Sequence, residues 1–331
     1  RRLHNCVTHE SLAFPMFGTH LDKRYDHKGP SMKDHVTPAL APEKFQDPLL
    51  TAKGEARAKV NLTRPETLWF NTGTLCNIEC VNCYIESSPT NDRLVYITAD
   101  EVTSYLDQLE ERDWNVREIG FTGGEPFMNP EMIEITRRAL DRGYDVLVLT
   151  NAMRPMMRKS MRAGLTELHG TYGDKLTLRI SVDHWSEDRH DTERGKGSFE
   201  KTLEGMRWLR DAGIRMAVAG RTVWGEMDAD ARAGYAALFD REGFEIDAFN
   251  PGETVLFPEM DVNVDVPEIT TACWGILNKS PQDVMCASSR MVVKRRGAET
   301  PAVVACTLLA YEPEFEMGPT LEDAERPVHL N

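Results

Sequence analysis

Three cysteines lie close together in the first third of the chain. Cys76, Cys80 and Cys83 occur in the run LCNIECVNCYIE, with three residues between the first pair and two between the second. Three thiolates on one short loop can hold three irons of a [4Fe–4S] cube and leave the fourth iron open. A zinc site would use a fourth ligand at matching spacing, and a thioredoxin-type motif would use only Cys80 and Cys83. The spacing therefore favours an open-site iron–sulfur cluster.

Two later motifs combine polar groups with small or apolar neighbours. In the run TGGEP, Gly123 and Gly124 would let the backbone approach a ligand closely, and Glu125 adds a carboxylate beside it. A tight turn before a helix is the alternative interpretation. Further on, Ser181 and Asp183 alternate with apolar residues at the end of a predicted strand, so both should point to one face of it.

These motifs belong to a region in which predicted strands and helices alternate. Apolar, β-prone runs predict strands at 67–71, 116–122, 145–150, 176–182, 214–222 and 244–249. Amphipathic runs predict helices at 99–112, 130–142, 154–163, 198–212 and 229–242. The pattern predicts an α/β fold with a parallel sheet and right-handed crossovers. Six repeats without a dinucleotide-binding fingerprint favour an open, partial (β/α)6 TIM-like barrel, whose site lies at the carboxyl ends of the strands.

The composition divides the chain into three parts. Residues 1–62 are rich in His, Pro, Lys and Asp and predict an irregular N-terminal extension. The barrel is expected over 63–250, and 251–331 should form a small extension that contains a β-hairpin. His184 and His190, on an expected loop inside the barrel region, are interpreted as solvated residues rather than metal ligands.

The overall charge excludes some classes of partner. The 331 residues carry a formal net charge of −14, which argues against a nucleic-acid surface. No apolar run approaches the roughly 20 residues of a membrane span, and the polar N-terminus lacks a signal-peptide core. Seven cysteines in such an acidic chain do not resemble a disulfide framework. We therefore expect a reducing, cytoplasmic location, with no nucleic acid and no membrane as partner.

The cysteine loop resembles the cluster-binding loop of radical S-adenosylmethionine (radical SAM) enzymes. In that family the open iron binds SAM, and reduction of the cluster yields methionine and a 5′-deoxyadenosyl radical that abstracts hydrogen from a substrate. The resemblance implies that Gly123, Gly124 and Glu125 form the GGE motif that holds the SAM amino group. It also implies that Ser181 and Asp183 lie near the SAM ribose and carboxylate.

The same resemblance suggests two further contacts with SAM. The run HDTERG is similar to a His-Asp…Arg-Gly pattern of the family, and its Arg194 would meet a carboxylate of the ligand or form a salt bridge at the start of a helix. Many members place an aromatic residue before the third cysteine, near the adenine, whereas here Asn82 occupies that position and Tyr84 follows the cysteine. The family implies a reductant protein such as ferredoxin or flavodoxin as partner, and a peptide or a small metabolite as substrate.

The C-terminal region contains a second set of three cysteines, Cys273, Cys286 and Cys306. Two β-prone runs around a glycine-containing turn predict a hairpin whose open end brings Cys286 and Cys306 together, with Cys273 joined by a short loop. By themselves they would be interpreted as buried hydrophobes. The arrangement resembles the twitch or SPASM extension of radical SAM enzymes, which implies an auxiliary [4Fe–4S] cluster. Its fourth iron would be open or take a ligand from beyond Asn331.

Two other classes of function remain alternatives at this point. A SAM-independent iron–sulfur electron-transfer protein would need the cysteines but neither the GGE motif nor the Ser181/Asp183 pair. A zinc-stabilised binding module would need the cysteines alone. The three motifs together favour the radical SAM enzyme.

Overall fold

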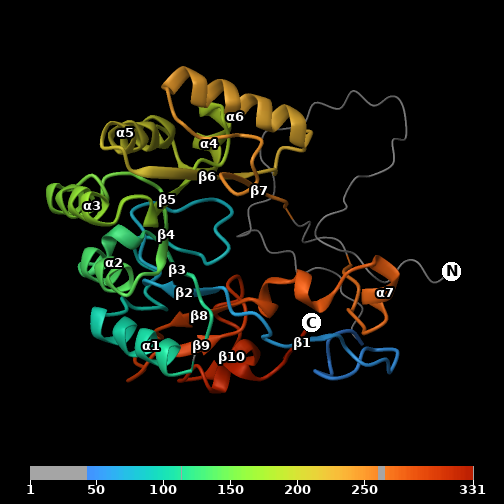
Figure 1. The fold of residues 1–331 in the computed structure, drawn as a ribbon. Coiled ribbons are helices and arrows are strands. Elements are labelled where there is room, and N and C mark those ends of the chain that lie inside the picture. Colours follow the sequence, from blue (N-terminus) through green and yellow to red (C-terminus); the bar gives the residue numbers. More distant parts are fainter. Residues whose placement is uncertain (1–42, 113, 260–264, 331) are drawn as a thin grey trace, which may run out of the picture.

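Nine strands form one continuous sheet in the computed structural model of the chain (Figure 1), which describes residues 43–112, 114–259 and 265–330. The strand order is β10-β9-β8-β2-β3-β4-β5-β6-β7. Residues 1–42 of the expected N-terminal extension lie outside the described residues. The described remainder, 43–62, includes the short strand β1 (Lys59–Val60), so this part is not wholly irregular.

The sheet from β2 to the edge strand β7 is built from parallel strands connected by helices. Its strands are β2 (Thr67–Asn71), β3 (Glu118–Thr122), β4 (Asp145–Thr150), β5 (Leu176–Ser181), β6 (Arg215–Arg221) and β7 (Thr254–Phe257). The helices are α1 (Ala99–Glu111), α2 (Met132–Asp141), α3 (Lys159–Tyr172), α4 (Glu187–Arg194), α5 (Ser198–Asp211) and α6 (Asp228–Glu242). Helices α1, α2, α3 and α5 lie side by side along one face of the sheet (Figure 1). This arrangement is the predicted open barrel, and five of its six predicted strands are confirmed.

The sixth predicted strand, 244–249, is wrong. Phe244, Ile246 and Ala248 do alternate and are buried, but this segment is not paired with the sheet. β7 pairs with β6 instead, with Val218 opposite Thr254. Alternation of apolar residues correctly indicated that 244–249 packs on the core. It could not indicate which segment forms hydrogen bonds with the edge of β6, because that depends on tertiary structure.

The third predicted helix, 154–163, is also displaced. The predicted helix stops just before Gly164, whereas α3 begins at Lys159 and continues through Gly164 to Tyr172. A Cβ at Gly164 would lie 2.7 Å from a methyl group of Ile133 on α2. The glycine therefore permits close packing of two helices, and Gly173, with φ of +58°, follows the true end.

The C-terminal extension joins the sheet directly. β8 (Ser289–Val293) is parallel to β2, while β9 (Ala302–Val304) and β10 (Glu316–Gly318) continue the sheet in antiparallel pairs. β8 and β9 form the predicted hairpin. The remaining elements are α7 (Cys273–Leu277), β11 (Val328–His329), which pairs with β1, and the short 3-10 helices η1 (Pro126–Met128), η2 (Gly173–Lys175), η3 (Pro281–Asp283), η4 (Met285–Ala287), η5 (Pro313–Phe315) and η6 (Asp323–Glu325). None of the described helices is long and apolar enough to cross a membrane.

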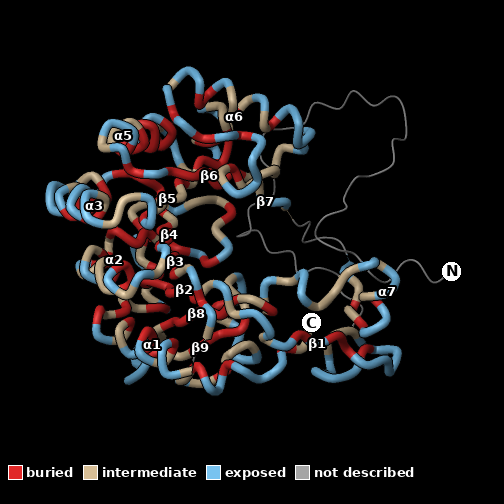
Figure 2. The backbone as a smooth tube through the Cα atoms, in the orientation of Figure 1, coloured by how far each residue is buried: buried red, intermediate tan, exposed pale blue. Residues whose placement is uncertain are grey.

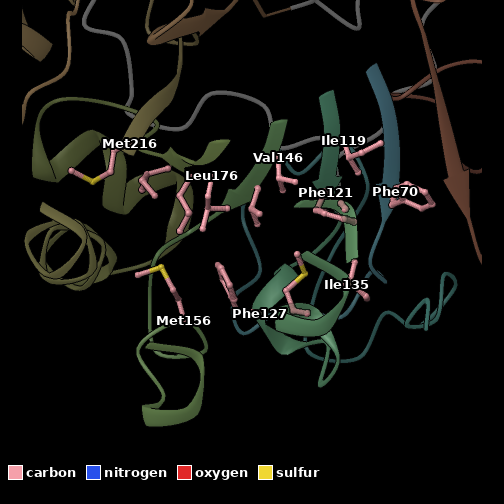
Figure 3. Packing of buried hydrophobic residues seen from close by; sticks show 14 of the residues in the cluster. Phe70, Ile119, Phe121, Phe127, Ile135, Val146, Met156, Leu176 and Met216 are labelled. Carbon is pink, nitrogen blue, oxygen red and sulfur yellow. The ribbon is translucent and has the colours of Figure 1, made fainter. Parts of the chain in front are cut away.

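The main hydrophobic core lies between the sheet and its helices. Figure 3 shows Phe70, Phe121 and Ile135 with other members of this core, and Figure 2 shows burial concentrated along the strands. A second, smaller core packs the region after β2 against the hairpin, and its members are Ile85, Leu94, Met291, Val293, Val304 and Ala310. The cysteine loop is thus fastened to the C-terminal extension by apolar contacts.

Candidate cofactor site

The three cysteines lie on a loop that leaves the carboxyl end of β2 and is closed at its base. The Cys76 amide donates a hydrogen bond to the Ser88 carbonyl at 3.0 Å. The Cys83 sulfur accepts a hydrogen bond from the Ser87 amide at 3.3 Å. Cys76 is buried, whereas Cys80 and Cys83 are half-buried. These two hydrogen bonds fix the ends of the loop that carries the three cysteines.

Burial keeps the thiols of Cys76 and Cys80 protonated in the absence of a bound cation. It raises the pKa of the Cys76 thiol to about 12 and that of Cys80 to about 11. Arg194 is a nearby cation that acts in the opposite direction on both thiols. Because the thiolate is the form that binds metal, these sulfurs become ligands when metal displaces their protons.

The cysteine loop can be compared with the needs of a single ion and of a cube. In the described part of the chain, no three His, Cys, Asp or Glu side chains converge as they would around one metal ion. A cube makes a different demand, because each of its thiolates binds a different iron. Three thiolates on one loop match the ligand number of an open-site cube.

The GGE segment after β3 packs directly on the cysteine loop. The Gly124 amide donates to the Gly73 carbonyl at 2.8 Å, and the Glu125 amide donates to the Leu75 carbonyl at 3.1 Å. A Cβ at Gly123 would lie 2.5 Å from the Gly73 oxygen, and one at Gly124 would overlap the Leu75 carbonyl. The two glycines are thus required for close contact between two protein segments, in addition to any contact with a ligand.

Glu125 is held in a cradle of three hydrogen-bond donors. Its side chain accepts from the Thr150 hydroxyl at 2.8 Å, the Asn151 amide at 2.9 Å and the Phe127 amide at 3.2 Å. The residue is 2% exposed, and burial raises the pKa of its carboxyl group. A carboxylate offers about four lone-pair positions, so one acceptor position remains for a ligand. An ammonium group there would stabilise the charged form.

Asn151 connects the corner after β4 to the cysteine loop. Its side-chain amide donates to the Asn77 side chain at 2.9 Å and lies 3.9 Å from the Cys76 sulfur. The next residue, Ala152, has φ of +56°, in the left-handed region. The Thr202 hydroxyl of α5 donates to the Asn151 carbonyl at 3.1 Å and fixes the corner from behind.

Buried Asp183 and half-buried Arg194 form an ion pair with two hydrogen bonds. The Arg194 Nε and Nη2 atoms donate to the two carboxylate oxygens at 2.7 and 3.0 Å. Burial would raise the pKa of Asp183, but the guanidinium outweighs it and the pKa is lowered. Since Arg194 also acts on the charges of Cys76 and Cys80, this pair places a fixed cation beside the cysteine loop.

The two remaining predicted SAM contacts lie at different places around the loop. Ser181 is half-buried at the carboxyl end of β5, opposite Ala219 of β6 in register. Tyr84 is 42% exposed, but its hydroxyl is bonded to the Thr122 side chain, and burial of that end raises the pKa of Tyr84 to about 12. The structure therefore brings the predicted residues to the carboxyl ends of β2, β3 and β5.

A second ion-pair network supports the loop, and the sequence did not reveal most of it. The Asn82 side chain donates to Glu193 at 2.7 Å, and Arg221 donates to the Asn82 carbonyl at 2.7 Å. Arg221 is also paired with both oxygens of Glu259 at 2.6 and 2.7 Å. Glu193 and Glu259 are ordinary charged residues in sequence, and only their positions beside Arg221 indicate a role.

The expectation of solvated histidines is wrong for His184 and His190. Both are buried, at 1% and 0% exposure, and His190 lies on α4 rather than on a loop. His184 Nε2 lies 2.6 Å from a carboxylate oxygen of Glu226. Burial lowers the pKa of His190 to about 4, so that imidazole is neutral. The run HDTERG is polar in sequence, but one face of α4, which carries His190 and Glu193, is buried.

The C-terminal cysteines are partly brought together as predicted. Cys286 and Cys306 flank the open end of the β8–β9 hairpin as free, half-buried thiols, and burial together with the nearby Cys306 raises the pKa of Cys286. Cys273 is buried at the start of α7, where its sulfur accepts from the Thr270 amide at 3.4 Å. It is disulfide-bonded in this structure, and a bonded sulfur ligates iron only after reduction.

Comparison with known proteins identifies the domain. Residues 70–230 match the family model of the radical SAM superfamily. The subtilosin biosynthesis protein AlbA of Bacillus subtilis is 33% identical over 193 residues, which is 56% of this chain and 40% of AlbA. The AdoMet-dependent heme synthase of Methanosarcina barkeri is 31% identical over 143 residues, covering 41% of this chain and 37% of that protein. The chain thus spans less than half the length of these relatives.

Solved structures agree on the fold. Streptococcus suis SuiB bound to its precursor peptide SuiA superposes with a TM-score of 0.57 at 13% identity, over 80% of this chain and 66% of SuiB. The enzyme anSMEcpe with bound AdoMet gives 0.54 at 14% identity, over 78% of this chain and 80% of that one. The cysteine loop, the sheet and these likenesses together define a radical SAM domain. Residues 70–230 therefore form a domain of the radical SAM superfamily.

Proposed function

We propose that this chain is an enzyme that cleaves SAM reductively and abstracts hydrogen from a peptide or a small metabolite. The observation that supports it best is the direct bonding of the GGE segment to the cysteine loop. Two amide–carbonyl bonds, from Gly124 and Glu125, place the Glu125 cradle at a constant position beside the cysteines. A SAM-independent electron-transfer protein would have no need of that cradle.

In this proposal each polar group has a separate task. Cys76, Cys80 and Cys83 hold the cluster, which when bound supplies the electron that converts SAM to methionine and the 5′-deoxyadenosyl radical. Glu125 accepts the SAM ammonium at its remaining acceptor position. Asp183 orients Arg194, whose charge suits the SAM carboxylate.

The contacts proposed for the ribose and adenine of SAM are based on where Ser181 and Tyr84 lie. Ser181, at the end of β5, is suited to the ribose, and the Tyr84 ring to the adenine. Gly123 and Gly124 keep the cradle close to the loop. A protein reductant such as ferredoxin or flavodoxin supplies the electron, and the reducing cytoplasm is the matching compartment.

The substrate class rests on the relatives. AlbA is named for bacteriocin biosynthesis and SuiB was solved with a precursor peptide, whereas other matches include heme synthases and probable GTP 3′,8-cyclases. Both a peptide and a small metabolite therefore remain within the proposal.

The decisive experiment detects 5′-deoxyadenosine. Protein reconstituted anaerobically with iron and sulfide is incubated with SAM and dithionite, and the products are measured by mass spectrometry. We expect 5′-deoxyadenosine and methionine in equal amounts. Replacing Cys76, Cys80 or Cys83 singly with Ala should abolish both products, and wild-type yield from any of these variants would refute the assignment.

We also propose an auxiliary [4Fe–4S] cluster at Cys286, Cys306 and reduced Cys273. Cys286 and Cys306 are two of the three proposed ligands and are free thiols at one end of a hairpin. The third ligand and the cluster itself rest on the twitch/SPASM resemblance. Iron analysis of reconstituted protein should give about eight irons per chain for two cubes. About four irons, unchanged when the three cysteines are replaced, would leave only the core cluster.

A further inference from the structure

The two residues between the second and third cysteines of the loop are held by a distant part of the fold. The Val81 amide donates to the Glu193 carbonyl at 2.9 Å, and the Asn82 side chain donates to the Glu193 carboxylate at 2.7 Å. Arg221 Nη1 donates to the Asn82 carbonyl at 2.7 Å. Asn82 and Glu193 are both buried, so water does not compete for these bonds. Together the bonds attach this part of the cysteine loop to the ends of α4 and β6.

The Arg221 side chain has little freedom to move. Its Nε and Nη2 atoms donate to the two carboxylate oxygens of Glu259 at 2.6 and 2.7 Å. Its Nη1 atom also lies 3.5 Å from a carboxylate oxygen of Glu193. A guanidinium is planar and presents its donors in fixed directions. The two bonds to Glu259 therefore also fix the direction in which Nη1 points, which is toward the Asn82 carbonyl.

The bond to the Asn82 carbonyl acts directly on Cys83. This carbonyl belongs to the peptide group that joins Asn82 to Cys83, and a peptide group is planar. Holding its oxygen therefore fixes the orientation of the plane from which Cys83 continues. The Cys83 sulfur accepts from the Ser87 amide at 3.3 Å, so the residue is held through its backbone and through its side chain. In the proposed function this sulfur is a ligand of the core cluster.

Arg221 is also bonded to the ion pair that is proposed for the SAM carboxylate. The Arg221 amide donates to the Asp183 carbonyl at 2.9 Å, and the Asp183 side chain holds Arg194 through two hydrogen bonds. Glu193, which bonds Asn82, is the residue before Arg194 on α4. The third cysteine and this ion pair are thus connected by short chains of hydrogen bonds that meet at Arg221. Such a connection matters because a misplacement of about 1 Å can slow a reaction about 100-fold.

We infer that Arg221 is a positioning residue that sets the orientation of Cys83, and so of the core cluster, relative to the ion pair proposed for the SAM carboxylate. This inference deepens the proposed function of SAM cleavage and rests on it. Arg221 acts through Asn82 and Asp183, without contact to SAM. Its loss leaves three thiols able to hold the cluster but changes the geometry in which SAM binds to it.

The test compares Arg221→Gln with Glu259→Gln in the full chain, reconstituted anaerobically with iron and sulfide. Arg221→Gln removes the guanidinium, whereas Glu259→Gln keeps it and weakens its anchor. Arg207→Gln is the matched control, because Arg207 on α5 is also paired with two carboxylates, those of Glu242 and Glu200, at 2.8 and 2.6 Å. Circular dichroism checks that each variant is folded.

Three further quantities are measured for each variant. They are the iron content, the change that SAM causes in the electron paramagnetic resonance spectrum of the reduced protein, and the yield of 5′-deoxyadenosine at saturating SAM. The spectral change reports on the core cluster, because SAM binds there in the proposed function. Its dependence on SAM concentration gives the Kd.

The expected results separate orientation of the cluster from its retention. Arg221→Gln should keep the iron content of the wild type, raise the Kd for SAM at least tenfold, alter the line shape of the SAM-bound cluster and lower the yield about 100-fold. Glu259→Gln should move the same quantities in the same direction, by less. The double variant should be no worse than Arg221→Gln, since both changes act through one guanidinium. Arg207→Gln should match the wild type.

Two results would overturn the inference. One is a folded Arg221→Gln variant whose SAM-dependent spectrum and Kd equal those of the wild type. The other is a double variant whose losses are the sum of those of the two single variants, because Glu259 would then act independently of Arg221. If Arg221→Gln does not fold, Glu259→Gln carries the test, and a wild-type response from that variant contradicts the inference.

Failure of the proposed function gives a different result. If the wild type itself shows no spectral change with SAM and no 5′-deoxyadenosine, the proposed function and the inference fall together. If the wild type responds to SAM and both Arg221→Gln and Glu259→Gln respond equally well, SAM cleavage stands and Arg221 has no positioning role in it.

Discussion

Single residues of the site are charged groups that are buried with their partners already in place. Glu125 has three donors, and Asp183 and Arg194 satisfy one another. Such groups are pre-oriented, so ligand binding does not have to order them. Such a site is sensitive to substitution, because removing one partner leaves the other buried and unpaired.

Glu125→Gln should weaken SAM binding while leaving the core cluster assembled. The amide keeps the shape of the side chain but removes a charge-assisted hydrogen bond to the ammonium, which contributes about 1.5–3 kcal/mol. The Kd for SAM should rise at least tenfold, measured by titrating the electron paramagnetic resonance signal of the cluster. Glu131→Gln is the control, since Glu131 accepts from the Ala99 amide outside the site. An unchanged SAM titration would contradict the role of Glu125.

Asp183→Asn should destabilise the fold in a pH-dependent way. It leaves the Arg194 guanidinium without its counter-charge, which costs about 3–5 kcal/mol at neutral pH. Because Arg194 holds the pKa of Asp183 below its ordinary value, this stabilisation is present above about pH 4 and is lost as the pH falls through the lowered pKa.

Urea unfolding of wild type and variant at several pH values tests this prediction. The difference in unfolding free energy should be constant near neutrality and should shrink below about pH 4. The control Asp228→Asn breaks the exposed pair with Arg232 and should cost less than about 1 kcal/mol. A difference that is the same at every pH would count against the ion pair.

At the scale of elements, close backbone contacts fix the position of helix α5 beside the site. Helix α5 approaches the corner after β4 so closely that a Cβ at Gly205 would overlap the Ala152 carbonyl. The same helix bonds the Asn151 carbonyl through Thr202. The helix therefore helps to position the residue that links Glu125 to the cysteine loop.

Gly205→Ala should consequently destabilise the protein, although alanine is the better helix former. Forcing the helix away from the corner costs about 1–3 kcal/mol. Gly170→Ala on α3 is the matched control, because nothing lies within 4 Å of its added Cβ, and it should stabilise by up to about 1 kcal/mol. Thermal unfolding measures both, and equal shifts in the two variants would show that α5 is not in tight contact.

At the scale of the whole molecule, the C-terminal extension is part of the central sheet. β8 pairs with β2 from Thr67 opposite Ser289 to Phe70 opposite Val292. Its residues are buried on both faces, and Met291, Val293 and Val304 pack with Ile85 beside the cysteine loop. The extension and the barrel should therefore unfold together.

A chain ended after residue 284 should fail to unfold cooperatively. It would lose β8 and leave the apolar edge of β2 exposed to water, which predicts binding of a hydrophobic dye and a broad thermal transition. A chain ended after residue 326 loses only β11 and should keep one sharp transition. If the shorter chain melts at the wild-type temperature, the extension is an independent unit.

The sequence by itself determined the alternation of strands and helices, the open α/β architecture, the cysteine loop and the GGE motif. These follow from short-range patterns, because hydrophobic period and cysteine spacing act within one segment. The tertiary structure decided that 254–257 rather than 244–249 completes the parallel strands, and that Gly164 lies inside a helix. It also buried His184 and His190. Each of these outcomes depends on which distant segment lies opposite a residue, and no local pattern contains that information.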